Sequence, residues 1–377
     1  MSPRRVLLVM GTRPEAIKLA PVLGALRARP ADFHPIVCST GQHREMLDQV
    51  FELFDITPDI DLRVMTHNQG LAGLTGQVLT GIDGVLERER PDLVLVQGDT
   101  TSTFVGALAA FYRRIPVGHV EAGLRTGNRF APFPEEINRT LAGHVADIHF
   151  APTERARQNL LREGIAADSI HVTGNTGIDA FLDVASRPEP SGGYAWSSHA
   201  GPLVAITAHR RESFGDGFAR ICAALRRLTE ARRETLFVYP VHRNPNVKGP
   251  VERELSDIPN MMLVEPMPYL PFCHLLKRAT IILTDSGGIQ EEAPSLQKPV
   301  LVLRDTTERP EAVEAGTAIL AGTDVEKIVS HATRLLGSEL DRAAMVGRGN
   351  PFGDGHAADR IADLLARIQT RRLDSGR

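Results

Sequence analysis

Short apolar runs alternate with amphipathic helical stretches along almost the whole chain, and this alternation limits the possible folds more than any other feature of the sequence. Residues 6–10, 93–96 and 116–120 are short and largely apolar, which is typical of buried strands. Apolar residues at helical spacing follow them, for example over residues 16–27 and 103–112. Such alternation predicts a parallel sheet with helices on both of its faces.

The same pattern begins again in the second half of the chain. Residues 203–207 are an apolar run, which a basic loop and a helical stretch follow. Before this run, residues 186–202 are rich in turn-forming residues, as interdomain segments often are. We therefore expect an α/β protein of two Rossmann-like, doubly wound domains, at residues 1–185 and 186–356, that face a central cleft. The amphipathic segment 357–377 is expected to pack back on the first domain.

The composition narrows the possible partners. The 377 residues carry a formal net charge of −3 and have a pI near 6.5, so the chain as a whole does not attract nucleic acid or anionic membranes. No apolar run approaches the roughly 20 residues of a spanning helix, and no signal-peptide pattern precedes the first strand. The three cysteines form no CxxC pair, which suits a reducing compartment. We expect a cytoplasmic protein without a nucleic-acid or membrane partner.

One strand-to-helix junction suggests a ligand. Residues 281–284 are an apolar run, residues 285–288 (Asp-Ser-Gly-Gly) predict a tight turn, and helix-forming residues follow at once. A helix N-terminus offers unpaired N–H groups to a phosphate, and glycines let the backbone approach a ligand closely. Glu291 or Glu292 would suit ribose hydroxyls, so the junction would bind a nucleotide diphosphate. On this spacing alone, an ordinary strand-to-helix turn is an equally good interpretation.

Polar residues gather where predicted strands end, and in a doubly wound domain this edge is the ligand crevice. They carry both signs of charge and lie at the strand ends or in the following loops: Arg13, Lys18, Asp99, His119, Glu121, Arg125, Glu135, Glu136, Arg139, His209, Arg210, His242, Arg243 and Ser286. An accumulation of this size predicts an active site.

Single residues keep alternative interpretations. Asp99 suits either the crevice or a helix N-cap. Glu121 directly follows a strand, where a carboxylate has few structural roles. Glu135 and Glu136 begin a helical stretch, where the helix dipole favours acids in any case. His209 changes its charge near neutral pH, so it suits proton transfer or phosphate binding as well as a structural role.

Several common motifs are missing from the sequence. There is no GxxxxGK[ST] motif, and no GxGxxG motif follows the first strand, so neither ATP nor a dinucleotide is indicated. There is no GxSxG motif and no cluster of His and Cys with metal-ligand spacing, and we predict no metal site. Residues 59–61 have the DxD form of metal-dependent sugar transferases, but their turn-like surroundings favour a solvated loop.

The remaining motifs run in order from about residue 5 to about residue 366: residues 11–18 (GTRPEAIK), 41–46 (GQHREM), 98–101 (GDTT), 118–126 (GHVEAGLRT), 134–139 (PEEINR), 209–212 (HRRE), 285–299 and 304–311 (RDTTERPE). In residues and in spacing, the chain closely resembles the bacterial non-hydrolysing UDP-N-acetylglucosamine 2-epimerases.

The resemblance implies two Rossmann-like domains in the glycosyltransferase-B arrangement, a homodimer, and a reaction without a metal or redox cofactor. The implied reaction interconverts UDP-N-acetylglucosamine (UDP-GlcNAc) and UDP-N-acetylmannosamine (UDP-ManNAc), which would supply ManNAc units for cell-surface polysaccharide. The C2 proton is removed and the C1–O bond to UDP breaks, which gives bound 2-acetamidoglucal and UDP. Re-addition on the other face of C2 completes the inversion.

The resemblance also implies roles by motif position. Asp99, Glu121 and Glu135 would be the acid/base groups, and His209 would assist the departure of the diphosphate. Other residues would bind the phosphates, the ribose (Glu292) and the uracil (Phe272); the full substrate-binding set is Arg13, Lys18, Arg139, His209, Phe272, Ser286, Gly287, Gly288 and Glu292. The sequence leaves open which carboxylate removes the C2 proton.

Some members of this family carry a second, activating UDP-GlcNAc site. The corresponding positions are Gln42, Glu45, Asn68, Glu136, Arg210 and His242. Glu45 and Asn68 stand where Gln and Arg are expected, so activation by substrate is in question.

Other activities stay open: an epimerase for a modified sugar nucleotide such as a diacetamido-uronate, a hydrolysing epimerase, a retaining glycosyltransferase of the same fold, or a UDP-sugar sensor. The dense carboxylates argue against the transferase and the sensor.

Overall fold

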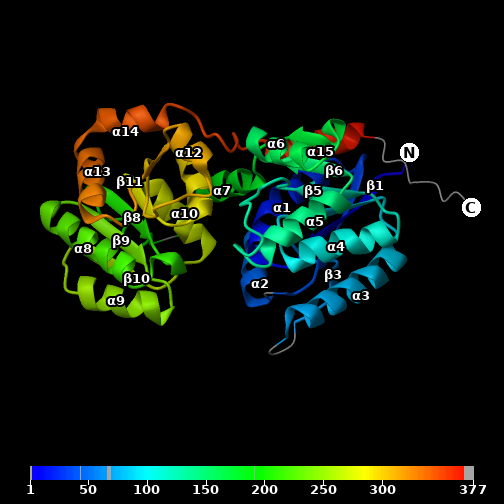
Figure 1. The fold of residues 1–377 in the computed structure, drawn as a ribbon, viewed down its shortest axis with the longest axis horizontal. Coiled ribbons are helices and arrows are strands. Elements are labelled where there is room, and N and C mark those ends of the chain that lie inside the picture. Colours follow the sequence, from blue (N-terminus) through cyan, green and yellow to red (C-terminus); the bar gives the residue numbers. More distant parts are fainter. Residues whose placement is uncertain (1, 43, 66–68, 191, 369–377) are drawn as a thin grey trace, which may run out of the picture. The chain divides into compact units, whose positions relative to one another are not determined.

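The computed structural model describes residues 2–42, 44–65, 69–190 and 192–368, without the side chains of residues 44–46. The chain forms two compact units, residues 1–180 with 352–377 and residues 181–351 (Figure 1). Each is built on a parallel sheet, which confirms the predicted pair of α/β domains. Among the residues that the structure describes, no helix has the length and apolar character that crossing a membrane requires.

The first unit has a parallel sheet with the strand order β3-β2-β1-β4-β5-β6-β7. Its strands are β1 (Arg4–Met10), β2 (Phe33–Ser39), β3 (Ile60–Asp61), β4 (Leu93–Gln97), β5 (Val117–Val120), β6 (Ile148–Ala151) and β7 (Ile170–Val172). Its helices are α1 (Arg13–Arg27), α2 (Arg44–Leu53), α3 (Leu71–Glu89), α4 (Thr101–Tyr112), α5 (Glu135–Val145), α6 (Glu154–Arg162), α15 (Ala357–Arg367) and the 3₁₀ turn η1 (Ala167–Ser169).

The second unit has a parallel sheet with the order β10-β9-β8-β11-β12-β13. Its strands are β8 (Leu203–Thr207), β9 (Leu236–Pro240), β10 (Met261–Val264), β11 (Ile281–Thr284), β12 (Val300–Val302) and β13 (Ala318–Leu320). Its helices and 3₁₀ turns are η2 (Arg211–Ser213), α8 (Asp216–Ala231), α9 (Pro245–Leu255), α10 (Tyr269–Arg278), α11 (Gly287–Glu292), η3 (Ala293–Leu296), α12 (Pro310–Glu314), α13 (Val325–Gly337) and α14 (Glu339–Val346).

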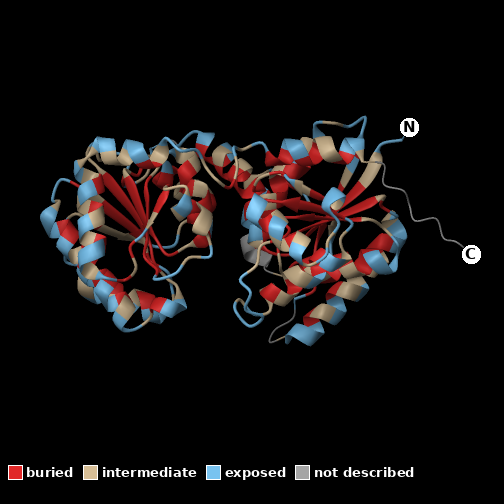
Figure 2. Cartoon of the chain, turned by 45° about the horizontal axis from the view of Figure 1, so that its top comes forward, coloured by how far each residue is buried: buried red, intermediate tan, exposed pale blue. Residues whose placement is uncertain are grey.

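Both cores lie along the inner strands of the sheets, such as β4, β5, β8 and β11, whose residues are all buried (Figure 2). In β1, Leu7 and Val9 pack against α3 and α4, and the alternating residues of the same buried strand point to the opposite face. Each buried side chain of this size contributes about 1.5–3 kcal/mol, so the strands are held from both faces. The polar loops at their carboxyl ends are therefore carried on a rigid base.

Helix α7 (Thr176–Ser186) contains the boundary between the units, at Ala180–Phe181. The boundary expected from the sequence, after residue 185, lies at the end of this helix. After the second unit the chain returns to the first, where α15 packs on α1. Asp179 accepts the backbone N–H of Ala358 at 2.8 Å, and the Arg29 guanidinium lies 2.6 Å from the Asp363 carboxylate.

Two local predictions need correction. Helix α1 begins at Arg13 rather than at Ala16, because Pro14 occupies the first helical turn, where a missing N–H costs nothing. Arg13 is therefore a helical residue and not part of a loop, and Lys18 lies further along the same helix. The DxD segment is not entirely a loop, since Ile60–Asp61 pairs with β2 as the edge strand β3.

Candidate active site

The predicted acids of the first unit come from neighbouring strands of one sheet. Asp99 follows β4 and Glu121 follows β5, and Gln97 is paired with Val120 at the ends of these strands. Parallel strands end at the same edge of a sheet, so both carboxylates lie at this edge. Arg13 and Lys18 stand on α1, which follows the adjacent strand β1, and Glu135 and Arg139 stand on α5.

Glu121 forms an ion pair with Lys18, between Oε2 and Nζ. The Glu121 side chain is only 9% exposed, so the ammonium group compensates a carboxylate that has lost most of its water. The Glu121 backbone has a φ of +64°, in the left-handed region that residues with a Cβ rarely adopt. Such strain is retained where the surrounding structure enforces it, most often at functional sites.

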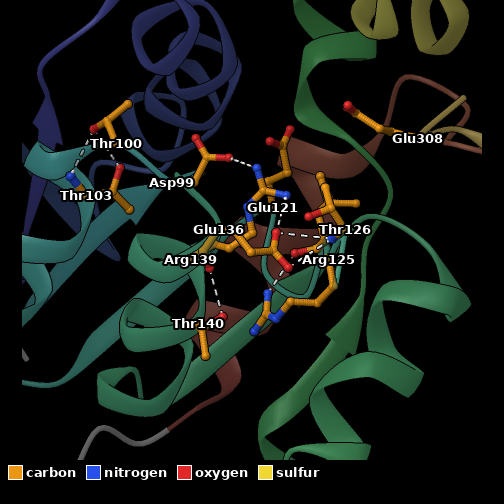
Figure 3. A network of polar contacts seen from close by, with 12 residues as sticks. Asp99, Thr100, Thr103, Glu121, Arg125, Thr126, Glu136, Arg139, Thr140 and Glu308 are labelled. Atoms are coloured by element: carbon orange, nitrogen blue, oxygen red, sulfur yellow. Dashed lines mark hydrogen bonds and ion pairs between the residues drawn. The ribbon is translucent and has the colours of Figure 1, made fainter. Parts of the chain in front are cut away.

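Asp99 is held by Arg139, whose guanidinium reaches both Asp99 and Glu136 (Figure 3). Burial raises the pKa of Asp99, and Arg139 opposes this rise. Glu136 is buried and also accepts the backbone N–H groups of Thr126 and Gly127, at 3.0 and 2.9 Å. Arg139 therefore links a candidate catalytic acid to the loop before α5.

Two other residues predicted for the crevice, His119 and Arg125, bind to neighbouring parts of the first unit. His119 is buried, and its Nε2 lies 2.7 Å from the carbonyl oxygen of Gly98, just before Asp99. Burial lowers the pKa of His119 to about 4, so the ring is neutral and donates its Nε2 proton to that carbonyl. Arg125 binds Glu163 through two nitrogens, each at 2.7 Å. Both side chains position loops of the site.

Sequence reasoning missed Glu15, the most enclosed carboxylate of this edge. Its Oε2 accepts the N–H of Gly11 at 3.0 Å, and its Oε1 lies 2.8 Å from Thr100 Oγ1 and 2.9 Å from Thr103 Oγ1. It thereby ties the β1–α1 loop to the β4–α4 loop that carries Asp99. Its position within the GTRPEAIK motif was visible, but an acid in the first turn of a helix is common.

Glu15 is expected to carry a proton. Thr103 has one hydroxyl proton and two acceptors, Glu15 Oε1 and the Gln97 carbonyl at 2.6 Å, and a proton on Glu15 resolves this conflict. Burial also raises the pKa of Glu15. The stability that this group contributes is thus fully present below the unfolded-state pKa of a glutamate and is lost as pH rises through the folded-state pKa.

We predict that Glu15→Gln flattens the decline of thermal stability as pH rises above the unfolded-state pKa of a glutamate, about 4.3, because its side chain has no proton to lose. Glu15→Ala should cost about 2–3 kcal/mol, since it leaves a cavity and unpaired donors. Thermal unfolding of both variants across this pH range measures the effect. A pH dependence in Glu15→Gln equal to that of the wild type would refute a protonated Glu15.

The second unit presents a separate group at the ends of β8 and β11. Asp285 is fully buried, and its Oδ2 accepts the backbone N–H groups of His209 and Arg210 at 2.6 and 2.7 Å. The imidazole rings of His209 and His242 stack with their centroids 5.3 Å apart. The strand, turn and helix predicted around residues 281–292 are present as β11 and α11.

Ser286 is the N-cap residue of α11, and its side chain makes no capping hydrogen bond. Gly287 and Gly288 form the first turn, and Glu292 stands half-buried at the helix end. Phe272 is half-buried on α10, which packs against η3. The sequence did not identify Arg309, whose guanidinium lies 3.8 Å from where a Cβ on Gly287 would stand and which forms an ion pair with the buried Glu291. The Arg309 guanidinium therefore lies close to the glycine backbone at the start of α11.

Residues 25–366 match the family model described as UDP-N-acetylglucosamine 2-epimerase. The chain belongs to this family. The UDP-N-acetylglucosamine 2-epimerase of Escherichia coli K12 is 54% identical over 369 residues, 96% of this chain and 98% of that protein. The solved UDP-GlcNAc 2-epimerase from Neisseria meningitidis bound to UDP-GlcNAc is 46% identical, with a TM-score of 0.86 over 97% of this chain and 100% of that one.

A more distant likeness concerns the fold alone. The solved glycotransferase of kitacinnamycin is 12% identical, with a TM-score of 0.65 over 97% of this chain and 99% of that one. The chain therefore shares its two-domain α/β architecture with a glycosyltransferase, as the sequence predicts.

Several of the residues that the sequence suggests for a second, activating site have their own local hydrogen-bond partners. Gln42 accepts a hydrogen bond from Ser102 at 3.0 Å, Glu136 binds the loop before α5, and His242 Nδ1 accepts the N–H of Asn244 at 3.1 Å. Glu45 belongs to α2 and Asn68 to the stretch 66–68, but the side chain of the first and the whole of the second lie outside the described residues. Within the part of the chain that is described, no three His, Cys, Asp or Glu side chains form a potential metal site.

Proposed function

We propose that this family member interconverts UDP-GlcNAc and UDP-ManNAc without hydrolysis. The observation that carries the proposal is the pair of carboxylates at adjacent strand ends, Asp99 with Arg139 and Glu121 with Lys18. Carboxylates that are buried against cations suit proton transfer at carbon, because their protonation responds to small changes in the surrounding charge. The E. coli and N. meningitidis relatives, which are named for this epimerisation, support the choice of substrate.

The proposed reaction begins at C1 of the sugar. The C2 proton has no adjacent carbonyl on the ring, so its acidity must come from positive charge that develops at C1 while the C1–O bond to UDP breaks. Anionic carboxylates near C1 and C2 stabilise this charge. One of Asp99, Glu121 and Glu135 takes the C2 proton, the electrons of the C2–H bond form the C1–C2 double bond, and the C1–O electrons leave with UDP.

The products of elimination are bound 2-acetamidoglucal and UDP. Re-addition of UDP at C1 and of a proton at the opposite face of C2 gives the epimer. Inversion requires proton delivery from the face opposite to removal, which favours two different carboxylates. We assign these two roles to Asp99, whose pKa is raised by burial, and to Glu121, which forms an ion pair with Lys18.

We assign the nucleotide-binding groups to the second unit. The backbone of Ser286, Gly287 and Gly288 would receive the diphosphate at the start of α11, with His209 beside it. The phosphate-binding role of Arg13 and Lys18, which belong to the first unit, stays a prediction from the resemblance. Glu292 would accept the ribose hydroxyls, and Phe272 would contact the uracil. His209 would donate a hydrogen bond to the departing diphosphate. A homodimer and a role in polysaccharide synthesis stay predictions; sedimentation equilibrium checks the first.

Proton NMR of the purified protein with UDP-GlcNAc in D2O, without added metal or acceptor, tests the function. We expect UDP-ManNAc with deuterium at C2, because the carboxylate that returns the proton exchanges with solvent. A sample without protein should stay unchanged. Free ManNAc and UDP would indicate a hydrolysing epimerase. An unchanged spectrum with both UDP-GlcNAc and a diacetamido-uronate analogue would reject the epimerase proposal.

A further inference from the structure

We propose that Asp285 is a positioning residue for His209, because it binds the histidine backbone with one carboxylate oxygen and receives the imidazole Nδ1–H with the other when a diphosphate is bound. This inference rests on the proposed role of His209.

The two oxygens of Asp285 are used differently. Oδ2 accepts two backbone N–H groups, those of His209 and Arg210, and thus fixes the start of the loop after β8. Oδ1 is buried and has no hydrogen-bond partner. A buried carboxylate oxygen that lacks a hydrogen-bond donor lowers the stability of the fold by about 1–3 kcal/mol, which is consistent with a functional role for Oδ1.

The nearby donor is the ring of His209. Its Nδ1 lies 3.8 Å from Oδ1, which is too far for a hydrogen bond but close enough for a modest rotation of the imidazole to form one. The His209 side chain is 39% exposed, so part of the ring is accessible to a ligand. The backbone clamp holds the histidine so that one edge of its ring faces Asp285.

The charged and titratable groups around His209 have opposite effects on the pKa of its ring. Burial lowers the pKa of His209, and the neighbouring His242 and Arg210 lower it further, whereas Asp285 raises it. Tyr239 also lies here, with its hydroxyl donating to the carbonyl of Ala208 at 2.6 Å. Among these groups, Asp285 is thus the one that raises the pKa of the ring and favours its protonated form, whereas burial, His242 and Arg210 act against it.

The proton matters when the C1–O bond breaks. Negative charge then develops on the terminal phosphate of UDP, and an imidazolium with Nδ1–H on Asp285 can present its Nε2–H to that oxygen. This contact is stronger in the transition state than in the ground state, so it lowers the barrier rather than only tightening binding. No proton has to leave the histidine, and the atoms of the elimination stay balanced.

The variant Asp285→Asn tests this arrangement in the full-length protein. The amide oxygen still accepts the two backbone N–H groups, but the amide nitrogen replaces Oδ1 and opposes a protonated Nδ1. We expect kcat to fall about 100-fold with little change in KM. We also expect the loss of activity toward high pH to begin at lower pH, because His209 gives up its proton more easily.

The direct readout is ¹⁵N NMR of the His209 ring in the UDP-bound protein across pH. The deprotonation midpoint should fall by about one pH unit in Asp285→Asn, the scale of one close charge. Asp179→Asn is the matched control, since Asp179 also accepts a backbone N–H with one oxygen and has no hydrogen-bond partner for the other. It should leave the His209 midpoint and kcat unchanged.

An unmoved midpoint in folded Asp285→Asn, whatever its kcat, would overturn the proposal. If that variant fails to fold, the wild type still decides: UDP should produce a downfield Nδ1–H resonance that His209→Gln removes, and its absence would equally overturn the inference. Failure of the epimerase proposal is distinguishable, because it would appear as wild-type protein that forms no UDP-ManNAc, regardless of the ring titration.

Discussion

Glu121→Gln is expected to lower kcat for epimerisation by about 1,000-fold, since a positioned general acid or base contributes about 10²–10⁴. Glutamine keeps the shape of the side chain but can neither take the C2 proton nor balance Lys18. Deuterium incorporation at C2 should fall in parallel with turnover. Glu89→Gln is the control, because Glu89 also forms an ion pair with a cation, Arg5 at 2.8 Å, but Arg5 lies at the amino end of β1 and not at the carboxyl ends that carry the site.

The backbone of Glu121 separates a chemical from a structural explanation. Its φ of +64° favours glycine, so Glu121→Gly should be about 1 kcal/mol more stable than Glu121→Ala, although both lack the carboxylate. Both variants should be inactive in the NMR assay. Activity within tenfold of the wild type in Glu121→Gln would remove Glu121 from the acid/base groups.

Gly123→Ala is expected to destabilise the first unit by about 3 kcal/mol or more. The glycine has a φ of +91°, and a Cβ there would lie 2.3 Å from the carbonyl oxygen of Ala156, a backbone atom that cannot move aside alone. Gly127→Ala is the matched control: its φ is +76°, but nothing lies within 4 Å of its Cβ position, so it should cost only the strain of about 1 kcal/mol.

Chemical denaturation followed by far-UV circular dichroism measures this difference. The single tryptophan, Trp196, is buried in the second unit, so its fluorescence reports that unit. Equal unfolding midpoints for Gly123→Ala and Gly127→Ala would show that the close approach to α6 does not matter.

The strands were predictable because burial on both faces leaves a continuous apolar run. Strands β8 and β11 have the bounds expected from residues 203–207 and 281–284. Strand β3 was not predictable, since two residues carry no periodicity and form a strand only through pairing with β2. The start of α1 was missed because Pro14 resembles a loop residue until its place in the first helical turn is known.

The position of the site and its acidic residues were predictable, but the ion pairs between its side chains were not. The edge that carries Asp99 and Glu121 follows from parallel strands, which place their carboxyl ends together. The partners of these acids, Arg139 and Lys18, lie far from them in sequence, and their selection depends on side-chain directions that no spacing encodes. Glu15 was hidden for a further reason: its burial results from the contact of two loops.

Helix α15 belongs to the first unit, but it follows the whole second unit in the sequence. Arg4 in β1 donates to the carbonyl oxygen of Ile368 at 2.9 Å, so the beginning of the chain is completed by a segment near its end. On the ribosome, residues 1–180 must wait for about 170 further residues before this helix emerges, at about 5–20 residues per second. The second unit is thus an insertion in the first, and its synthesis is complete before that of the first unit. Until α15 has been made, the first unit, which carries Asp99 and Glu121, exposes the α1 surface that α15 covers.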